Sequence, residues 1–243
     1  MLFYIIAFSV AILGLSSANK PTLPVTSCKR GSDDYSACLK RAFQEAWPRF
    51  VAGMPEFDFP SLDPLYYKYG KVVYNSDLIH ANVIGSNITV FGFSKTHVFD
   101  IRTHFFNDNF RLEIDVISPK LFIQGIMNVN GTLGDIFGFV NEGPFNITGD
   151  DVRATWDLTG HVVNDTWIVE HFRMLPSVES VKVYFNLFPD NKELNDLAVS
   201  FANLYWPLLY YNLIPTMSNV WDPWVAGIAN KFFSKVSFSE VFR

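Results

Sequence analysis

The sequence predicts an α+β fold in which a curved antiparallel β-sheet closes over a long, apolar C-terminal helix. One observation that supports this prediction is the absence of any charged residue between Asp196 and Asp222. Prolines and asparagines within this segment disfavour the alternative of a membrane-spanning helix. A second observation is that apolar and polar residues alternate from Val72 to Leu187, which is the period of β-strands. The third is a helical period over residues 33–52.

The first 18 residues form a segment without charge that closes on the small residues Ser16 and Ala18. Such a segment is typical of a secretory signal peptide, predicted here over residues 1–18, with a retained membrane anchor as the alternative. No linker rich in glycine, serine or proline divides the rest of the chain. We therefore predict a single secreted, extracellular domain over residues 19–243.

Secretion predicts two further features of the chain. The even cysteine count suits one disulfide between Cys28 and Cys38 in an oxidising compartment, with a pair of free thiols as the alternative. Four Asn-x-Thr sequons are candidate N-glycosylation sites. These sites are Asn87, Asn130, Asn146 and Asn164.

The helical pattern of residues 33–52 has a candidate N-cap at Ser32 or Asp33 and ends at Gly53. Pro48 is expected to kink this helix, because it removes one backbone hydrogen bond and crowds the preceding turn. Three prolines in the next segment, residues 54–64, predict an extended path.

The two clearest strands run from Phe110 to Val116 and from Leu121 to Val129, where apolar and polar residues alternate. Further alternating runs cover residues 154–158, 167–172 and 181–187. No helix-length pattern interrupts them, and parallel strands would need long crossovers, so the sheet is expected to be mainly antiparallel. Its apolar face needs a partner, and the uncharged segment, predicted to be a helix buried on all sides, is the candidate.

That C-terminal segment is expected to begin at Asn191, which can cap a helix. Pro207, Pro215 and Pro223 recur at regular spacing and predict kinks or breaks. Asp222 and Pro223 suit the cap and first position of a last helix, which would end near Lys235.

Several classes of function find no support in the residues. A net charge of −5 and an isoelectric point near 5.5 argue against nucleic-acid binding and against basic patches that grip anionic lipid. The chain has no GxSxG nucleophile motif, and its five histidines show no HExxH or other tight metal-ligand spacing. We therefore predict no catalytic residues, no metal site and no cofactor.

The composition instead favours a site for a hydrophobic small molecule. The chain is 49% hydrophobic and 16% aromatic, which is more apolar mass than a core requires. A curved sheet closed over an apolar helix leaves an apolar gap wherever packing is incomplete. The alternative for each side chain is ordinary core. The expected lining residues are Trp47, Leu112, Ile114, Ile123, Met127, Trp156, Phe201, Leu204, Tyr205 and Leu208.

Several segments together resemble the insect Takeout and juvenile hormone binding protein family, over nearly the full mature length. They are SCKRGSDDYSACLKRAF, AGMPEFDFPSLDPL, VIGSNITVFGFS, SPKLFIQGIMNVNG, GPFNITGDDV, NLFPDNKELNDLAVSFANLYWPLL and FFSKVSFSEVF. The hormone-binding branch carries a further disulfide, whereas this chain has only Cys28 and Cys38, so it is more similar to Takeout.

The resemblance implies an α/β-wrap, a TULIP-like super-roll in which a strongly bent sheet surrounds a long C-terminal helix. It also implies a tunnel for one fatty acid, terpenoid or juvenile-hormone-like lipid, in a secreted carrier from a family with circadian and feeding roles. A lipid-surface or innate-immune lipid-binding protein is the first alternative, and a secreted lipid hydrolase is the second. No stable membrane insertion is expected, and the sequence does not indicate a protein partner.

Overall fold

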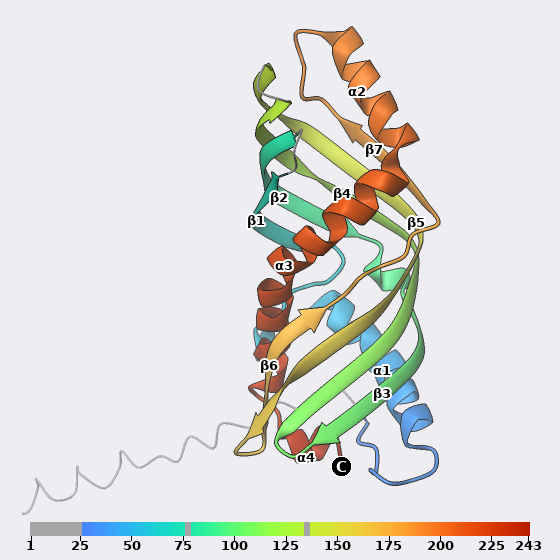
Figure 1. Cartoon of the computed structure of the whole chain (residues 1–243). Helices are drawn as coiled ribbons and strands as arrows, with labels where there is room; N and C mark the ends of the chain where they lie inside the picture. The colour runs from blue at the N-terminus through green and yellow to red at the C-terminus, as the bar shows by residue number, and fades with distance from the viewer. Residues whose placement is uncertain (1–25, 76–78, 134–136) are drawn as a thin grey trace, which may run out of the picture.

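The computed structural model describes residues 26–75, 79–133 and 137–243 (Figure 1). The signal peptide predicted over residues 1–18 lies outside the described residues. The longer elements are α1 (Tyr35–Ala52), β1 (Leu65–Asn75), β2 (Ile79–Phe91), β3 (His97–Phe106), β4 (Asn109–Leu133), β5 (Phe137–Val163), β6 (Thr166–Arg173), β7 (Ser180–Phe185), α2 (Lys192–Leu204) and α3 (Trp206–Phe233). Short helical turns η1 (Pro55–Phe57), η2 (Phe93–Lys95) and α4 (Phe238–Val241) complete the described chain.

The described strands form one antiparallel sheet, as predicted, with the long strands β4 and β5 at its centre. At the end of the molecule that carries α2, the upper half, the strand order is β1-β2-β4-β5-β7. At the end that carries α4, the lower half, the order is β3-β4-β5-β6. The central pair β4–β5 is therefore flanked by β2 and β7 in the upper half and by β3 and β6 in the lower half.

The two strands predicted on either side of Pro119 are one continuous strand, so their separation was wrong. Pro119 lies where β4 changes partner, because Ile117 is the last residue paired with β3 and Phe122 is the first paired with β2. Pro119 has no partner on β5 either. Its missing N–H therefore removes no ladder hydrogen bond, which is the condition under which proline is tolerated in a strand.

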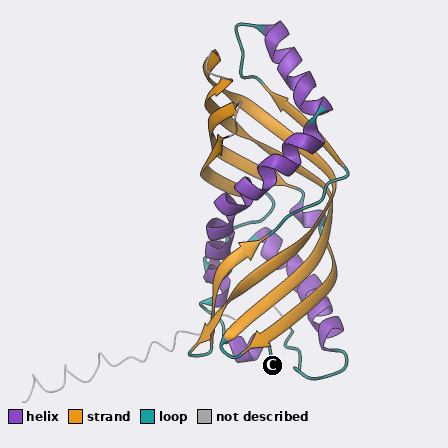
Figure 2. Ribbon diagram, viewed as in Figure 1, coloured by secondary structure: helices purple, strands orange, loops and turns teal. Residues whose placement is uncertain are grey.

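The sheet buries opposite faces in its two halves. Leu112, Ile114 and Val116 are buried in the lower half, whereas Val129 is buried in the upper half. Because side chains alternate along a strand and the β4–β5 register does not shift, these two groups project from opposite faces of β4. Helices accordingly lie on different sides of the sheet in the two halves (Figure 2).

The lower half contains the larger hydrophobic core, in which Trp167 and Phe110 are almost fully buried with ring centroids 4.8 Å apart. The helix α1 and the C-terminal part of α3 contribute to this core. The predicted disulfide is confirmed, since Cys28 and Cys38 are bonded and thereby tie the first described residues to α1. Cys28 also forms a β-bridge with Phe242, which brings the two ends of the described chain together.

The start of α1 differs from the prediction. The helix begins at Tyr35, so the residue before it is Asp34 rather than Ser32 or Asp33, and no side chain caps this end. It runs through Pro48 without a break and ends before Gly53, as predicted.

The C-terminal segment, in which kinks or breaks were expected at three prolines, contains one break. Between α2 and α3 the chain bends at Tyr205, and Pro207 occupies the second position of α3, where its missing N–H needs no helical partner. Pro215 and Pro223 lie inside α3, so neither of them breaks the helix, and the prediction of a separate last helix was wrong. The predicted cap is confirmed, because Asn191 Oδ1 accepts a hydrogen bond from the Leu194 N–H at 3.0 Å.

Asparagine side chains of α2 and α3 bond the free edges of the sheet. The Val183 N–H of β7 donates to Asn203 Oδ1 at 2.9 Å, and Asn203 Nδ2 donates to the Val183 carbonyl at 2.7 Å. In the lower half Asn230 makes the same pair of bonds to Val169 of β6, at 2.8 and 2.7 Å. Each amide therefore replaces the strand that would otherwise pair with this edge.

The helix α1 bonds the remaining lower edge, strand β3, in a similar way. Ser36 Oγ donates to the Ile101 carbonyl at 2.6 Å, and Gln44 Nε2 donates to the Val98 carbonyl at 3.3 Å. These bonds fix α1 along β3 and leave its apolar side on the lower core.

Removal of the disulfide by Cys38→Ser is expected to destabilise the protein by about 2 to 3 kcal/mol, because a short loop closure is lost from the unfolded chain. Thermal unfolding followed by circular dichroism measures the effect. The wild-type protein in excess reductant should unfold at the temperature of the variant. An unchanged melting temperature in both samples would contradict a stabilising role for this bond.

Asn230→Ala is expected to cost about 1 to 3 kcal/mol in unfolding free energy, because the Val169 N–H and carbonyl lose their partner at a part-buried edge. Asn212→Ala is the matched control, since Asn212 is exposed and donates only to the Leu208 carbonyl of its own helix. The control should lie within about 0.5 kcal/mol of the wild-type value in urea unfolding. Equal effects of the two substitutions would show that the hydrogen bonds from Asn230 to the edge strand β6 do not stabilise the fold.

Candidate functional site

The helices α2 and α3 cover the upper half of the sheet loosely. In α2, which the structure describes in full, the one buried residue is Asn195. The buried residues of α3, also fully described, are Ala226, Ile228 and Phe232, all in its last third. The long apolar stretch between these points is therefore packed far less tightly than a core helix.

The sheet face below these helices shows the same incomplete burial. Ile123 and Met127 of β4 and Phe145 of β5 are apolar and only half-buried. The buried cluster of the upper half consists of Val129, Phe185 and Leu187, whereas the lower core draws on the five strands β1, β3, β4, β5 and β6 and on the helices α1, α3 and α4. The apolar side of α2 and α3 and the apolar face of the upper sheet thus face each other, and their side chains are less completely buried than those of the lower core.

Four of the predicted lining residues lie in the lower half instead. Leu112 and Ile114 are buried in the lower core, and Trp156 is half-buried against it. The rings of Trp47 and Trp156 are 5.6 Å apart, and Trp47 Nε1 donates to the Phe93 carbonyl at 3.0 Å. The structure therefore brings these four together but places them on the opposite sheet face from Ile123 and Met127.

The predicted lining residues Phe201, Leu204, Tyr205 and Leu208 are exposed on the helices. The opposite side of α2 faces the sheet, because Val199 and Ala202 pack against the upper cluster. The expectation of a helix buried on all sides was therefore wrong. The physical reason is that α2 and α3 cross one open face of the curved sheet, so only one side of each helix can be covered (Figure 1).

Two polar groups of α3 were not singled out from the sequence. The Tyr210 hydroxyl donates to the Pro176 carbonyl at 2.5 Å, and burial raises the pKa of Tyr210 to about 12. Trp221 Nε1 is buried and has no hydrogen-bond acceptor among the described residues. The only sequence signal for either group was its place within the uncharged segment.

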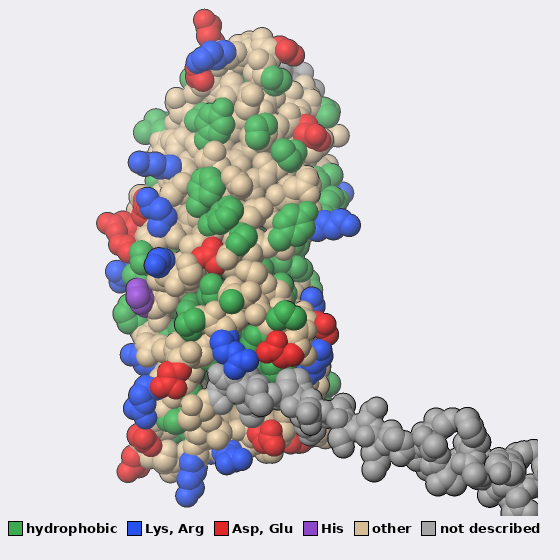
Figure 3. Space-filling model, turned by 180° about the vertical axis from the view of Figure 1, so that it is seen from behind, with side chains coloured by type: hydrophobic (Ala, Val, Ile, Leu, Met, Phe, Trp, Pro, Cys, Tyr) green, Lys and Arg blue, Asp and Glu red, His purple; other side chains and the backbone are tan. Residues whose placement is uncertain are grey.

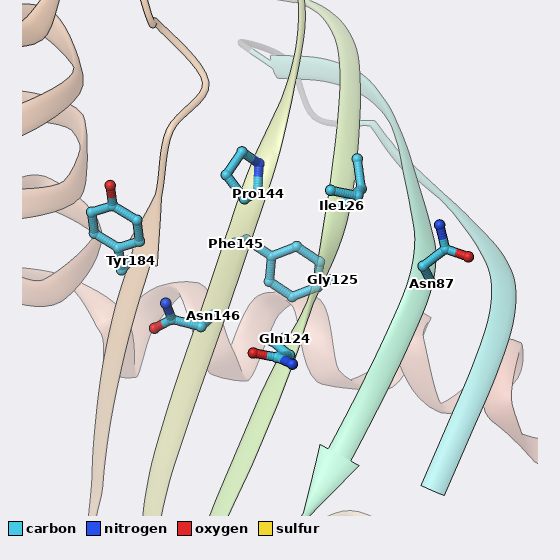
Figure 4. A pocket seen from close by; sticks show the side chains of 8 residues that line it. All are labelled: Asn87, Gln124, Gly125, Ile126, Pro144, Phe145, Asn146 and Tyr184. Atoms are coloured by element: carbon cyan, nitrogen blue, oxygen red, sulfur yellow. The ribbon is translucent and has the colours of Figure 1, made fainter. Parts of the chain in front are cut away.

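The outer face of the upper sheet carries a shallow groove of about 400 Å³. Its lining includes the amides of Asn87, Gln124 and Asn146 and the ring of Tyr184, and the strands separate it from the helix in Figure 4. On the upper part of this face, hydrophobic side chains are scattered among backbone and uncharged side chains of other types, with few charged side chains (Figure 3). This groove lies on the sheet face opposite to the apolar surfaces beneath α2 and α3, and its lining combines amide side chains with Ile126 and Pro144.

The sequons occupy accessible positions. Asn87, Asn130 and Asn164 are exposed, and Asn146 is half-buried in the outer groove. Asn164 lies in the two-residue turn between β5 and β6, where it and Asp165 both have positive φ, as hairpin turns of this length require. Glycosylation at these four residues remains a prediction.

Other chemistry that the sequence left open has little support in the structure. Among residues 26–75, 79–133 and 137–243, no three histidine, cysteine, aspartate or glutamate side chains gather where they could hold a metal ion. His104 Nε2 lies 2.8 Å from Glu113 Oε2, within a network of charged pairs on the lower outer face. No helix in the described part of the chain has the length and hydropathy needed to cross a membrane.

Known proteins match this chain over most of its length. The putative beta-carotene-binding protein of Schistocerca gregaria is 22% identical over 231 residues, covering 90% of this chain and 88% of that protein. The circadian clock-controlled protein daywake of Drosophila melanogaster is 22% identical over 234 residues, covering 90% of this chain and 87% of daywake. The crystal structure of Takeout 1 from Epiphyas postvittana has the same fold, with a TM-score of 0.68, 20% identity and coverage of 90% of this chain and 100% of that one.

The family model described as haemolymph juvenile hormone binding protein matches residues 4–243. Members of this family bind hydrophobic ligands and are not enzymes, which removes support for the lipid-hydrolase alternative. The wrapped α+β fold and the resemblance predicted from the sequence are both confirmed. The chain belongs to the haemolymph juvenile hormone binding protein family, together with Takeout, and is a binding protein.

Proposed function

We propose that the protein is a secreted carrier that holds one hydrophobic small molecule between α2–α3 and the inner face of the upper sheet. The observation that carries this proposal is the incomplete burial of two facing apolar surfaces. Ile123 and Met127 lie on the sheet side, and Leu209 and Leu213 are half-buried on α3. A protein interior of this composition normally packs densely, so half-buried apolar surfaces that face each other suit an additional apolar occupant.

The ligand is expected to be a long-chain fatty acid or a terpenoid. Burial of apolar surface contributes roughly 25 cal/mol per Å², so a flexible hydrocarbon can bind without many polar contacts. The relative named as a putative beta-carotene-binding protein supports including terpenoids in the candidate class.

Secretion is the second part of the proposal. The disulfide between Cys28 and Cys38 supports it, since such bonds persist in oxidising compartments. The predicted signal peptide and the accessible sequons are consistent with the same route.

Native mass spectrometry of the protein secreted from insect cells is expected to show a retained ligand of lipid mass. The complex should lose this mass on denaturation, because no covalent link is proposed. A protein that is secreted, folded and free of bound lipid, and that also fails to bind added fatty acids or terpenoids, would contradict the carrier function.

Ile123→Trp is expected to block binding of a fluorescent fatty-acid probe by at least about tenfold while the protein stays folded, because the added ring enters loosely packed space. Ile114→Trp is the matched control on the same strand, since Ile114 is only 3% exposed in the lower core. That control should instead lower stability by about 1 to 3 kcal/mol through overpacking.

Leu204→Trp provides a second control, because Leu204 lies on the outer side of the helix. This variant should bind the probe as the wild-type protein does. If Leu204→Trp blocks the probe and Ile123→Trp does not, the ligand lies outside the region between the helices and the sheet. Probe titration and thermal unfolding of all three variants distinguish these outcomes.

A further inference from the structure

The outer side of α2 and α3 carries a row of large apolar side chains that are more than half exposed. We call this row the α2–α3 stripe. Its members and their exposed fractions are Leu197 at 67%, Phe201 at 54%, Leu204 at 72%, Leu208 at 62% and Tyr211 at 72%. Contiguous exposed apolar patches are uncommon on monomeric proteins and mark interaction sites.

The spacing of the stripe is that of a helix-pairing seam. Successive members from Leu197 to Tyr211 are separated by four, three, four and three residues. In a helix this alternation keeps apolar side chains on one line and is the pattern by which two helices pack knobs into holes. The chain bends at Tyr205 between the two helices, but the four-residue hydrogen bonds from the Tyr205 N–H to the Phe201 carbonyl and from the Leu209 N–H to the Tyr205 carbonyl continue through the bend. At 1.5 Å per residue the stripe is roughly 21 Å long when followed along the two helices.

The charge distribution along the stripe favours a second copy of this chain over an anionic lipid surface. No residue from 197 to 221 is charged, so two copies of the stripe oppose no like charges. Lys192, near the start of α2, is paired with Asp196, and the next basic residue is Lys231. Amphipathic helices that bind anionic membranes instead carry lysine and arginine along their polar face.

We propose that the α2–α3 stripe is a self-association surface, through which two copies of the protein pair with antiparallel helices about a two-fold axis. Centring the pair on the bend between α2 and α3 places Leu204 opposite Leu208 of the second copy. The same register places Phe201 opposite Tyr211 of the second copy. Such a contact is self-complementary, as a two-fold interface requires.

The size of the stripe sets the strength of the pairing. Standard stable interfaces involve about 20 to 30 residues on each side, many more than the stripe provides. The dimer is therefore expected to be weak and dependent on protein concentration, with a dissociation constant on the order of micromolar.

The sequons leave this surface accessible. Asn130 and Asn146 lie on the outer face of the upper sheet, since Asn146 pairs across the ladder with Gln124 and Asn130 follows it at even spacing on β4. The helices cover the other face, and the stripe points away from the sheet. Glycans on these two asparagines would therefore not cover the stripe.

Sedimentation equilibrium of the secreted, detergent-free protein tests the proposal. The wild-type protein is expected to shift from monomer to dimer between about 1 and 100 µM. Leu204→Glu and Phe201→Glu should each weaken association by at least about tenfold, because a charge enters the apolar seam. Both side chains are already exposed, so the melting temperature should not fall.

Phe106→Glu is the matched control. Phe106 is 61% exposed, close to the exposure of Phe201, but it lies at the end of β3 in the lower half. This variant should associate as the wild-type protein does. If Phe106→Glu and Phe201→Glu weaken association equally, the dimer does not use the stripe and the proposal fails.

A charge-pair experiment tests the antiparallel register. Leu204→Glu and Leu208→Lys should each be monomeric alone, and their equimolar mixture should recover association at least about tenfold, because the register brings the new Glu and Lys together. A mixture that stays monomeric overturns this register.

Two further outcomes would overturn self-association itself. One is a wild-type protein that remains monomeric up to about 100 µM. The other is a monomeric protein that floats with phosphatidylcholine vesicles and loses this binding in Leu204→Glu, which would assign the stripe to a lipid surface.

Discussion

The unpaired edges of a curled, open sheet are the constraint on which the rest of this structure depends. Exposed strand edges invite pairing with other chains, and a barrel would remove them by closure. Here side chains of the helices form hydrogen bonds to the backbone of these edge strands instead. Asn203 bonds to β7, Asn230 bonds to β6 and Ser36 bonds to β3. Because each amide bonds both polar groups of one backbone residue, the helices are fixed at the margins of the sheet. Asn203, one of the asparagines within the uncharged segment that argued against a membrane helix, is thus one of the residues that attach this segment to the sheet.

Because the sheet buries opposite faces in its two halves, the two halves differ in packing and in the role that we assign to each. The lower half combines the aromatic core, the disulfide and the bridge between the chain ends, and it supplies stability. The upper half has a small buried cluster under helices that are held mainly at the sheet edge. Loose packing there can be tolerated because the lower half holds the fold. The helices α2 and α3 therefore have one side for the proposed ligand and one for the proposed partner.

Much of the fold could be predicted from local patterns in the sequence. Alternation along Phe110 to Val116 and again along Leu121 to Val129 identified the strands, and the absence of crossovers made them antiparallel. Asn191 was recognised as a helix cap and Cys28 and Cys38 as a disulfide, because both depend on short-range chemistry. The apolar positions also change from even to odd numbers across Pro119, which was a readable sign that β4 changes its buried face. This sign was missed because the two segments were interpreted as two separate strands.

The candidate site could be predicted only in part, because its lining depends on which helix side meets which sheet face. Ile123 and Met127 lie beneath the helices, whereas Leu112 and Ile114 lie in the other core, although all four fit the same apolar pattern. Leu204 and Leu208 point outward because edge bonds hold the opposite helix side on the sheet. By itself the sequence determined the strands, the disulfide, the uncharged helical segment and the family. Only the tertiary structure decided which apolar side chains are core, half-buried or exposed, because that depends on contacts between residues far apart in the chain.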